Sequence, residues 1–149
     1  MKNRTGSFFS VLARLLVGGV LVAAGYATLL APLEDFIMTV NGYAVLPVWA
    51  VPRFAQALPW VEALIGLAVI IGLSQRFSLR VVAGLITLFW LVLGQALLRR
   101  LPITDCGCFG RMFALAPRQM WLIDGALLVL AWWLVDRHTS SPSVDEWLG

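Results

Sequence analysis

Residues 79–98 read LRVVAGLITLFWLVLGQALL and give the clearest local evidence of how this chain folds. A helix that crosses the hydrocarbon core of a bilayer needs roughly 20 mainly apolar residues, because each residue advances the helix by about 1.5 Å. The run has this length, and Arg99 and Arg100 close it. We therefore expect a transmembrane helix over 79–98.

The composition of the whole chain agrees with this expectation. The 149 residues are 60% hydrophobic and 13% charged, with a mean hydropathy of +0.88. Soluble domains average about half apolar and about a quarter charged residues. A chain this short cannot bury such an excess in a soluble core, so part of the apolar surface must face lipid. The net charge of +3 forms no basic patch interleaved with aromatics, and we expect no nucleic-acid binding.

Three further apolar runs are predicted to span the membrane, over 8–31, 58–73 and 120–135. The first run can also be interpreted as a cleaved signal peptide with an exit near residues 24–27. We favour a span because the run continues to Pro32, which should end the helix. The predicted fold is an all-α integral membrane protein, a bundle of four transmembrane helices over 1–137, followed by a polar, disordered tail over 138–149.

The first loop is predicted to contain a short amphipathic helix. Apolar residues recur there with helical spacing, at Leu33, Phe36, Ile37 and Val40. Pro32 suits the first position of this helix and Gly42 suits its end. The helix is too short to span, so we expect it to lie along the membrane interface. Residues 43–52 should follow as an extended loop, with Pro59 in the first turn of the second span and a tight turn over 74–78.

An even number of spans places both termini on one side of the membrane. The positive charges are divided almost evenly between the two sides and barely decide which side this is. The first helix usually dominates orientation, and Lys2 and Arg4 precede it. We therefore expect cytoplasmic termini, with the amphipathic loop and the loop between the last two spans on the other side of a bacterial inner membrane.

The loop between the last two spans carries the only two cysteines, Cys106 and Cys108. They belong to a hexapeptide, DCGCFG, composed of Asp105, Cys106, Gly107, Cys108, Phe109 and Gly110. Cys-Gly-Cys can close a small, strained disulfide ring, and strain makes a disulfide more oxidising and exchangeable. Gly107 gives the ring its backbone freedom, and Gly110 relieves crowding beside it.

A redox-active dithiol is the interpretation that we favour for this pair. Nearby arginines favour the thiolate form, although Asp105 opposes it locally. A permanent disulfide that pins the turn and a two-thiolate copper(I) site are the alternatives, together with two inert thiols. The ligands are too few for a zinc site.

Four polar residues of the spans are predicted to lie at one depth, roughly 6–8 Å below this loop at 1.5 Å per residue. They are Tyr26, Glu62, Gln95 and Asp124. A carboxylate in this layer, Glu62 above all, can relay protons for thiol exchange. The simpler explanation is that Glu62 and Asp124 suit helix N-terminal turns and that the layer bonds helices together. Arg14, near the other end of the first span, is expected to extend to the headgroups.

Several segments together resemble the methylamine utilisation protein MauE family, within the wider group of DoxX-like membrane proteins. They are residues 14–19 (RLLVGG), 24–27 (AGYA), 46–47 (LP), 58–62 (LPWVE) and 105–110 (DCGCFG). They follow one another along nearly the whole chain, and 105–110 is the specific part. Thr28 departs from the pattern, because such proteins often carry Lys there.

The resemblance implies a bacterial inner-membrane bundle for the redox maturation of disulfide-containing periplasmic proteins, beside a thioredoxin-like partner. It implies that Cys106 and Cys108 are the redox pair and that Glu62 is a family-matching acid. Whether the chain is a thiol–disulfide oxidoreductase stays open, since a non-catalytic assembly factor or anchor, or a small metal or solute carrier, also fits the sequence. No cofactor is evident. A relay would need an electron acceptor such as a quinone, for which the sequence offers no residue set.

Overall fold

The computed structural model describes residues 4–103 and 116–137. Within these ranges the chain is all-helical and contains no strand. The helices are α1 (Arg4–Leu30), α2 (Leu33–Gly42), α3 (Val51–Ile71), α4 (Gln75–Leu98) and α5 (Pro117–Arg137). The four long helices are apolar enough to cross a membrane, over Phe8–Leu30, Val51–Ile71, Gln75–Leu98 and Pro117–Asp136. The predicted architecture of four spans and one short helix is confirmed.

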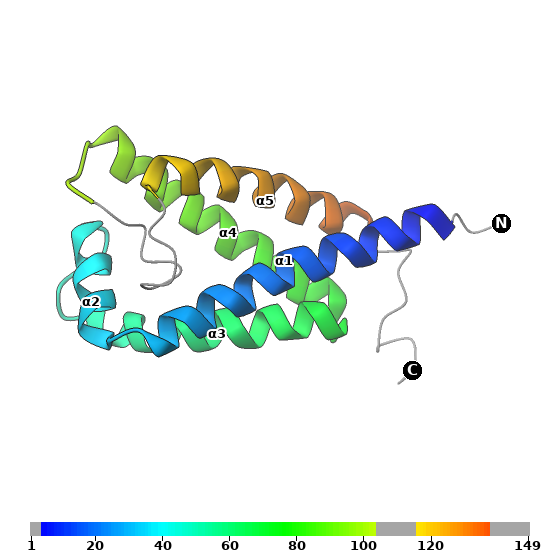
Figure 1. The fold of residues 1–149 in the computed structure, drawn as a ribbon, viewed down its shortest axis with the longest axis horizontal. Coiled ribbons are helices and arrows are strands. Elements are labelled where there is room, and N and C mark those ends of the chain that lie inside the picture. The colour runs from blue at the N-terminus through cyan, green and yellow to red at the C-terminus, as the bar shows by residue number, and fades with distance from the viewer. Residues whose placement is uncertain (1–3, 104–115, 138–149) are drawn as a thin grey trace.

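The long helices form two pairs, in which α1 packs along α3 and α4 packs along α5. Figure 1 shows that the pairs lie close together at one end of the bundle and separate towards the other end, which carries α2. We call these the closed end and the open end. The first described residues of α1 and the last residues of α5 both lie at the closed end, as an even number of spans requires. The predicted tail over 138–149 lies outside the described residues.

All four long helices contribute to the core at the closed end. Its most deeply buried members include Val17 of α1, Val69 of α3, Leu79 and Val82 of α4, and Leu134 of α5. Lipid is as apolar as these side chains, so close packing rather than the hydrophobic effect has to hold the helices together. The closed end therefore depends on how tightly the helices fit.

Two glycines produce the closest helix approach at this end. A Cβ atom on Gly18 of α1 would lie 2.8 Å from the carbonyl oxygen of Gly66 in α3. The converse holds as well, since a Cβ on Gly66 would lie 2.8 Å from the carbonyl oxygen of Gly18. The backbones of α1 and α3 consequently touch at a point where no other residue type fits without displacement.

Arg14 also joins these two helices, which corrects the expectation that it extends to the headgroups. Its side chain is 4% exposed. Nε and Nη2 donate to the carbonyl oxygen of Val69 at 3.2 and 3.1 Å, and Nη2 donates to that of Ile70 at 3.3 Å. These carbonyls belong to the last turn of α3, where the backbone lacks helical partners and the helix dipole favours a cation. Arg14 is thus a helix cap supplied by a neighbouring helix.

The second span begins at Val51, so the predicted start at residue 58 is wrong. Proline lacks an N–H group and is tolerated in the first turn of a helix, and Pro52 occupies that position. Pro59 lies inside the helix instead of in its first turn. Helix α3 has 21 residues and is therefore longer than the predicted span over 58–73. The connection from α2 is a series of turns over 43–50 rather than an extended loop.

The turn between the second and third spans is also shorter than predicted. Helix α3 ends at Ile71 and is followed by Gly72, whose φ of 82° is left-handed and favours glycine. Helix α4 already begins at Gln75, after Ser74 with a φ of 43°. The Ser78 hydroxyl donates to the carbonyl oxygen of Leu73 at 2.8 Å, so residues predicted as turn belong to the first helical turn.

The predicted amphipathic helix is present as α2, which begins at Leu33, one residue after the predicted Pro32, and ends at the predicted Gly42. Its apolar face, Phe36 with Ile37 and Val40, packs against Phe54 and Leu58 of α3 and against Phe89 of α4. Figure 1 shows α2 across the open end of the bundle. The short helix therefore covers the space that the separating helix pairs leave.

Candidate functional site

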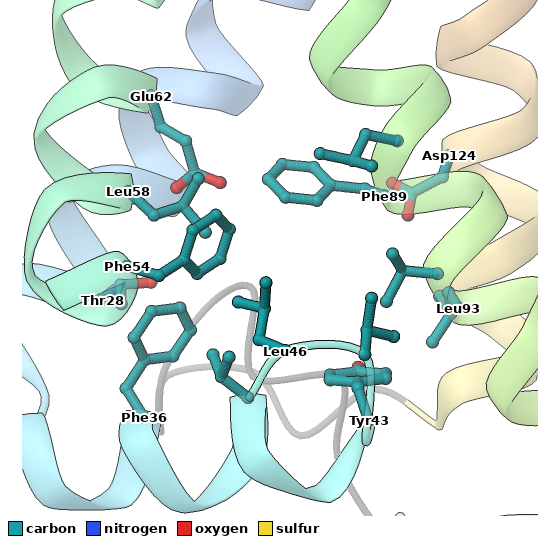
Figure 2. A pocket seen from close by; sticks show the side chains of 14 residues that line it. Thr28, Phe36, Tyr43, Leu46, Phe54, Leu58, Glu62, Phe89, Leu93 and Asp124 are labelled. Atoms are coloured by element: carbon teal, nitrogen blue, oxygen red, sulfur yellow. The ribbon is translucent and has the colours of Figure 1, made fainter. Parts of the chain in front are cut away.

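A cavity of about 140 Å³ occupies the open end of the bundle (Figure 2). It lies between the two helix pairs, and α2 with the turn that follows it forms one wall. Most lining side chains are aliphatic or aromatic. The residues around it are Thr28, Phe36, Val40, Tyr43, Val45, Leu46, Phe54, Leu58, Glu62, Leu88, Phe89, Val92, Leu93 and Asp124.

Two carboxyl groups enter this apolar cavity from opposite walls, Glu62 from α3 and Asp124 from α5. Glu62 is 4% exposed and Asp124 is 7% exposed. Within the described part of the chain, no hydrogen bond or ion pair is formed by either group. Both also line a smaller cavity of about 30 Å³ that extends into the core beside Val17 and Leu127. The pair thus lies where the cavity meets the core.

A buried carboxyl group without a partner is costly, because water no longer solvates it. Structural acids in cores are accordingly hydrogen-bonded or paired in most proteins. Arg14 shows that this protein can bond a buried ionisable group to a neighbouring helix when the group serves packing. Glu62 and Asp124 are instead directed at an open volume, which is the arrangement expected of groups that meet a ligand or a proton.

Glu62 and Asp124 line the same cavity, whereas Tyr26, which was predicted at the same depth, does not. The Tyr26 side chain is 59% exposed and faces away from the cavity. Thr28 faces inward instead, at 5% exposure, and its hydroxyl donates to the carbonyl oxygen of Ala24 at 2.9 Å. Two residues advance an α-helix by about 200°, so positions 26 and 28 point in nearly opposite directions. The phase of α1, which the apolar run does not reveal, decides between them.

Gln95 has a structural task beside the cavity, although it does not line it. Its Nε2 donates to the carbonyl oxygen of Tyr43 at 3.0 Å, and its Oε1 accepts from Nη1 of Arg99 at 3.0 Å. The first bond attaches the turn after α2 to the end of α4, and the second lies within the end of α4. The first bond thereby holds Tyr43 in the cavity wall, a role that its place in the sequence does not reveal.

A tryptophan pair fixes α5 against α4 near Asp124. The rings of Trp90 and Trp121 stack with centroids 5.0 Å apart and an interplanar angle of 17°. A Cβ on Gly125 would lie 3.1 Å from Nε1 of Trp90, and one on Gly94 would lie 3.0 Å from Nε1 of Trp121. Each indole therefore rests on a glycine of the facing helix. Trp121 is half-buried in this contact.

The six residues of the cysteine motif, Asp105, Cys106, Gly107, Cys108, Phe109 and Gly110, lie outside the described residues. The residues on either side of this segment, 101–103 and 116–137, are described. Residues 104–115 connect the end of α4 to the start of α5, and both of these helix ends lie at the open end of the bundle. Among the described residues, no group of three His, Cys, Asp or Glu side chains is placed to hold a metal ion.

Comparison with known proteins gives this architecture a family. The family model described as "Methylamine utilisation protein MauE" matches residues 6–136. A MauE of Methylorubrum extorquens is 27% identical over 116 residues, which cover 73% of this chain and 61% of that protein. A MauE of Methylophilus methylotrophus is 30% identical over 118 residues, which cover 79% and 62%.

The chain therefore spans about three-fifths of the length of these two curated relatives. No solved structure matches it. The family model covers most of the chain and includes all four spans, the helix α2 and the cysteine motif. This multi-pass membrane protein belongs to the methylamine utilisation protein MauE family.

Proposed function

We propose that this chain serves methylamine utilisation by supporting the maturation of disulfide-containing periplasmic proteins through thiol–disulfide exchange at Cys106 and Cys108. The proposed exchange partner is a thioredoxin-like periplasmic protein. Family membership and the Cys-Gly-Cys spacing support the proposal. On this proposal the protein lies in a bacterial inner membrane, with cytoplasmic termini and a periplasmic cysteine segment.

One observation carries the proposal furthest. The only two cysteines belong to the segment that joins α4 to α5 at the open end, where Glu62 and Asp124 enter a cavity without partners among the described residues. Thiol–disulfide exchange needs a thiolate and a group that takes up and returns its proton. A dithiol motif between two helix ends of the open end, and two carboxyl groups in the cavity there, match those needs.

When this protein oxidises its partner, a partner thiolate attacks one sulfur of the Cys106–Cys108 disulfide. An S–S bond then forms between the proteins, and the other sulfur of the pair leaves as a thiolate. The second thiolate of the partner then attacks this mixed disulfide and releases the remaining sulfur. The partner has lost two electrons and two protons, and the Cys106–Cys108 dithiol has gained them.

Thiol trapping in intact cells tests this function. The single variants Cys106→Ser and Cys108→Ser cannot form the intramolecular disulfide. In one of them the remaining thiolate should attack the disulfide of an oxidised partner, whose other sulfur leaves as a thiolate, and a disulfide-linked complex with a periplasmic protein should accumulate because no second cysteine of this chain resolves it. Reductant should dissolve the complex. If both variants support full maturation of the client and no mixed disulfide forms, the cysteines are structural and the proposal is wrong.

The same cells test the orientation. A membrane-impermeant alkylating reagent added from outside, after permeabilisation of the outer membrane, should modify Cys106 and Cys108 once they are reduced. A cysteine placed at Ser74, in the turn at the closed end, serves as the matched control and should stay unmodified until the inner membrane is opened. The opposite labelling pattern would invert the topology.

A further inference from the structure

We infer that the cavity at the open end binds the ring of a membrane quinone, with Glu62 and Asp124 as the groups that meet its two carbonyl oxygens. The inference deepens the proposed function and rests on it for the redox step, because a dithiol that is oxidised again after each exchange needs an electron acceptor. Its structural part, the quinone site, rests only on described residues.

The size and lining of the cavity suit a six-membered ring. An apolar cavity of about 150 Å³ in another protein binds benzene, so about 140 Å³ is sufficient for one ring. Phe36, Phe54 and Phe89 line the volume (Figure 2). Aromatic rings prefer offset stacking or edge-to-face contacts with such neighbours.

The two polar groups suit a ligand with an acceptor at each end. Glu62 and Asp124 lie on opposite walls, and each is more than nine-tenths buried. A protonated carboxyl group donates a hydrogen bond to a carbonyl oxygen, and a para-quinone presents two such oxygens across its ring. A hydrocarbon would leave both carboxyl groups unsatisfied, whereas a quinone satisfies both.

The cavity is also accessible to a ligand that dissolves in the bilayer. Val45 and Leu88 line it and are 50% and 47% exposed, so these two side chains lie between the cavity and the outer surface of the bundle, and the cavity is not fully enclosed. Leu88 lies in the middle of the transmembrane helix α4, where that surface faces lipid. An isoprenoid tail can leave the cavity on this side and stay among the lipid chains.

The redox step balances with this acceptor. Two S–H bonds of Cys106 and Cys108 break and one S–S bond forms, which releases two electrons and two protons. The quinone takes up both electrons and both protons, so its two C=O groups become C–OH groups. Glu62 and Asp124 pass the protons to the two oxygens, and the hydroquinone returns to the bilayer.

Binding is tested with the full chain in lipid nanodiscs and radiolabelled ubiquinone-1 as the probe. The Cys106→Ser/Cys108→Ser double variant is used, so that no electron transfer accompanies binding. We expect saturable binding above the partition into protein-free nanodiscs. The absence of a saturable component overturns the inference, and so does saturable binding of methylammonium in place of ubiquinone-1, which would assign the carboxylates to a cation.

A matched pair of substitutions locates the site. Val92 lines the cavity and Leu91, its neighbour in α4, is 56% exposed and does not line it. Val92→Trp fills the volume and should weaken ubiquinone-1 binding at least about tenfold, whereas Leu91→Trp should leave it unchanged. A Glu62→Leu/Asp124→Leu variant should weaken binding similarly without filling the volume. Equal affinity in all of these proteins places the quinone elsewhere and overturns the assignment.

A turnover measurement separates this inference from the proposed function. The reduced wild-type protein should form one hydroquinone per Cys106–Cys108 disulfide when ubiquinone-1 is added. If ubiquinone-1 does not bind but mixed disulfides with a periplasmic protein still form, the quinone site is wrong and the exchange function stands. If ubiquinone-1 binds but no cysteine variant traps a partner, the cavity assignment stands and the exchange function is wrong.

Discussion

The closed and open ends of the bundle both bury ionisable groups, and they treat them in opposite ways. Arg14 at the closed end donates to two carbonyls of the neighbouring helix. Glu62 and Asp124 at the open end face a cavity and bond to no described residue. Burial is nearly the same in all three, at 4%, 4% and 7% exposure. Bonding, rather than burial, therefore separates a group that supports the fold from one that is available for chemistry.

Four substitutions test this contrast, in order of their expected effect on stability. Gly66→Val at the closed end should have the largest, because its Cβ would lie 2.8 Å from the carbonyl oxygen of Gly18. Such overpacking costs about 1–3 kcal/mol, and here backbone atoms rather than a flexible side chain are in the way. Gly84→Val is the control, since a Cβ there meets nothing within 4 Å. Thermal unfolding in detergent should show a much larger loss for Gly66→Val, and equal losses would contradict the tight contact.

Arg14→Leu should have the next largest effect, about 2 kcal/mol, because hydrogen bonds from a charged group to the α3 carbonyls disappear. Arg80, which is exposed near the same end, provides the matched control. Arg80→Leu should change the free energy of unfolding by less than about 0.5 kcal/mol, as is usual for surface positions. If both variants unfold alike, Arg14 does not cap α3.

Gln95→Leu should have a smaller effect, about 1 kcal/mol, since it removes one hydrogen bond to the Tyr43 carbonyl. Its specific consequence is local, because the turn after α2 loses its attachment to α4. Hydrogen exchange should increase over residues 43–46 and stay unchanged in α1. Equal hydrogen-exchange rates over residues 43–46 in Gln95→Leu and in the wild-type protein would show that other contacts hold this wall of the cavity.

Glu62→Gln should have the smallest effect on stability, because the residue bonds to no described group and the amide keeps its volume. Its effect on function should be large. If Glu62 relays protons, exchange between Cys106–Cys108 and its partner slows about a hundredfold, as for other general acids and bases. Glu34→Gln on the exposed face of α2 is the control. An unchanged exchange rate in Glu62→Gln would show that this acid relays no proton; helix-end electrostatics, the simpler explanation from the sequence, does not apply, because α3 begins at Val51 and Glu62 lies in its middle.

The site was predictable from the sequence only in part. Glu62 and Asp124 were found because acids inside apolar runs are rare and conspicuous. Phe54, Phe89 and Thr28 give no such signal, because aromatic residues and threonine occur on every face of a membrane helix. Gln95 was noticed, but its bond to Tyr43 joins residues more than fifty positions apart and could not be read from either neighbourhood.

The sequence by itself determined the four spans and the short amphipathic helix, because hydrophobic length and helical periodicity are local properties. It also determined the cysteine motif. Only the tertiary structure decided that Thr28 and not Tyr26 faces inward, that Arg14 caps α3, and that Glu62 and Asp124 share one cavity. These features depend on the rotation of each helix about its axis and on where the helix pairs separate, and both are set by packing between distant segments.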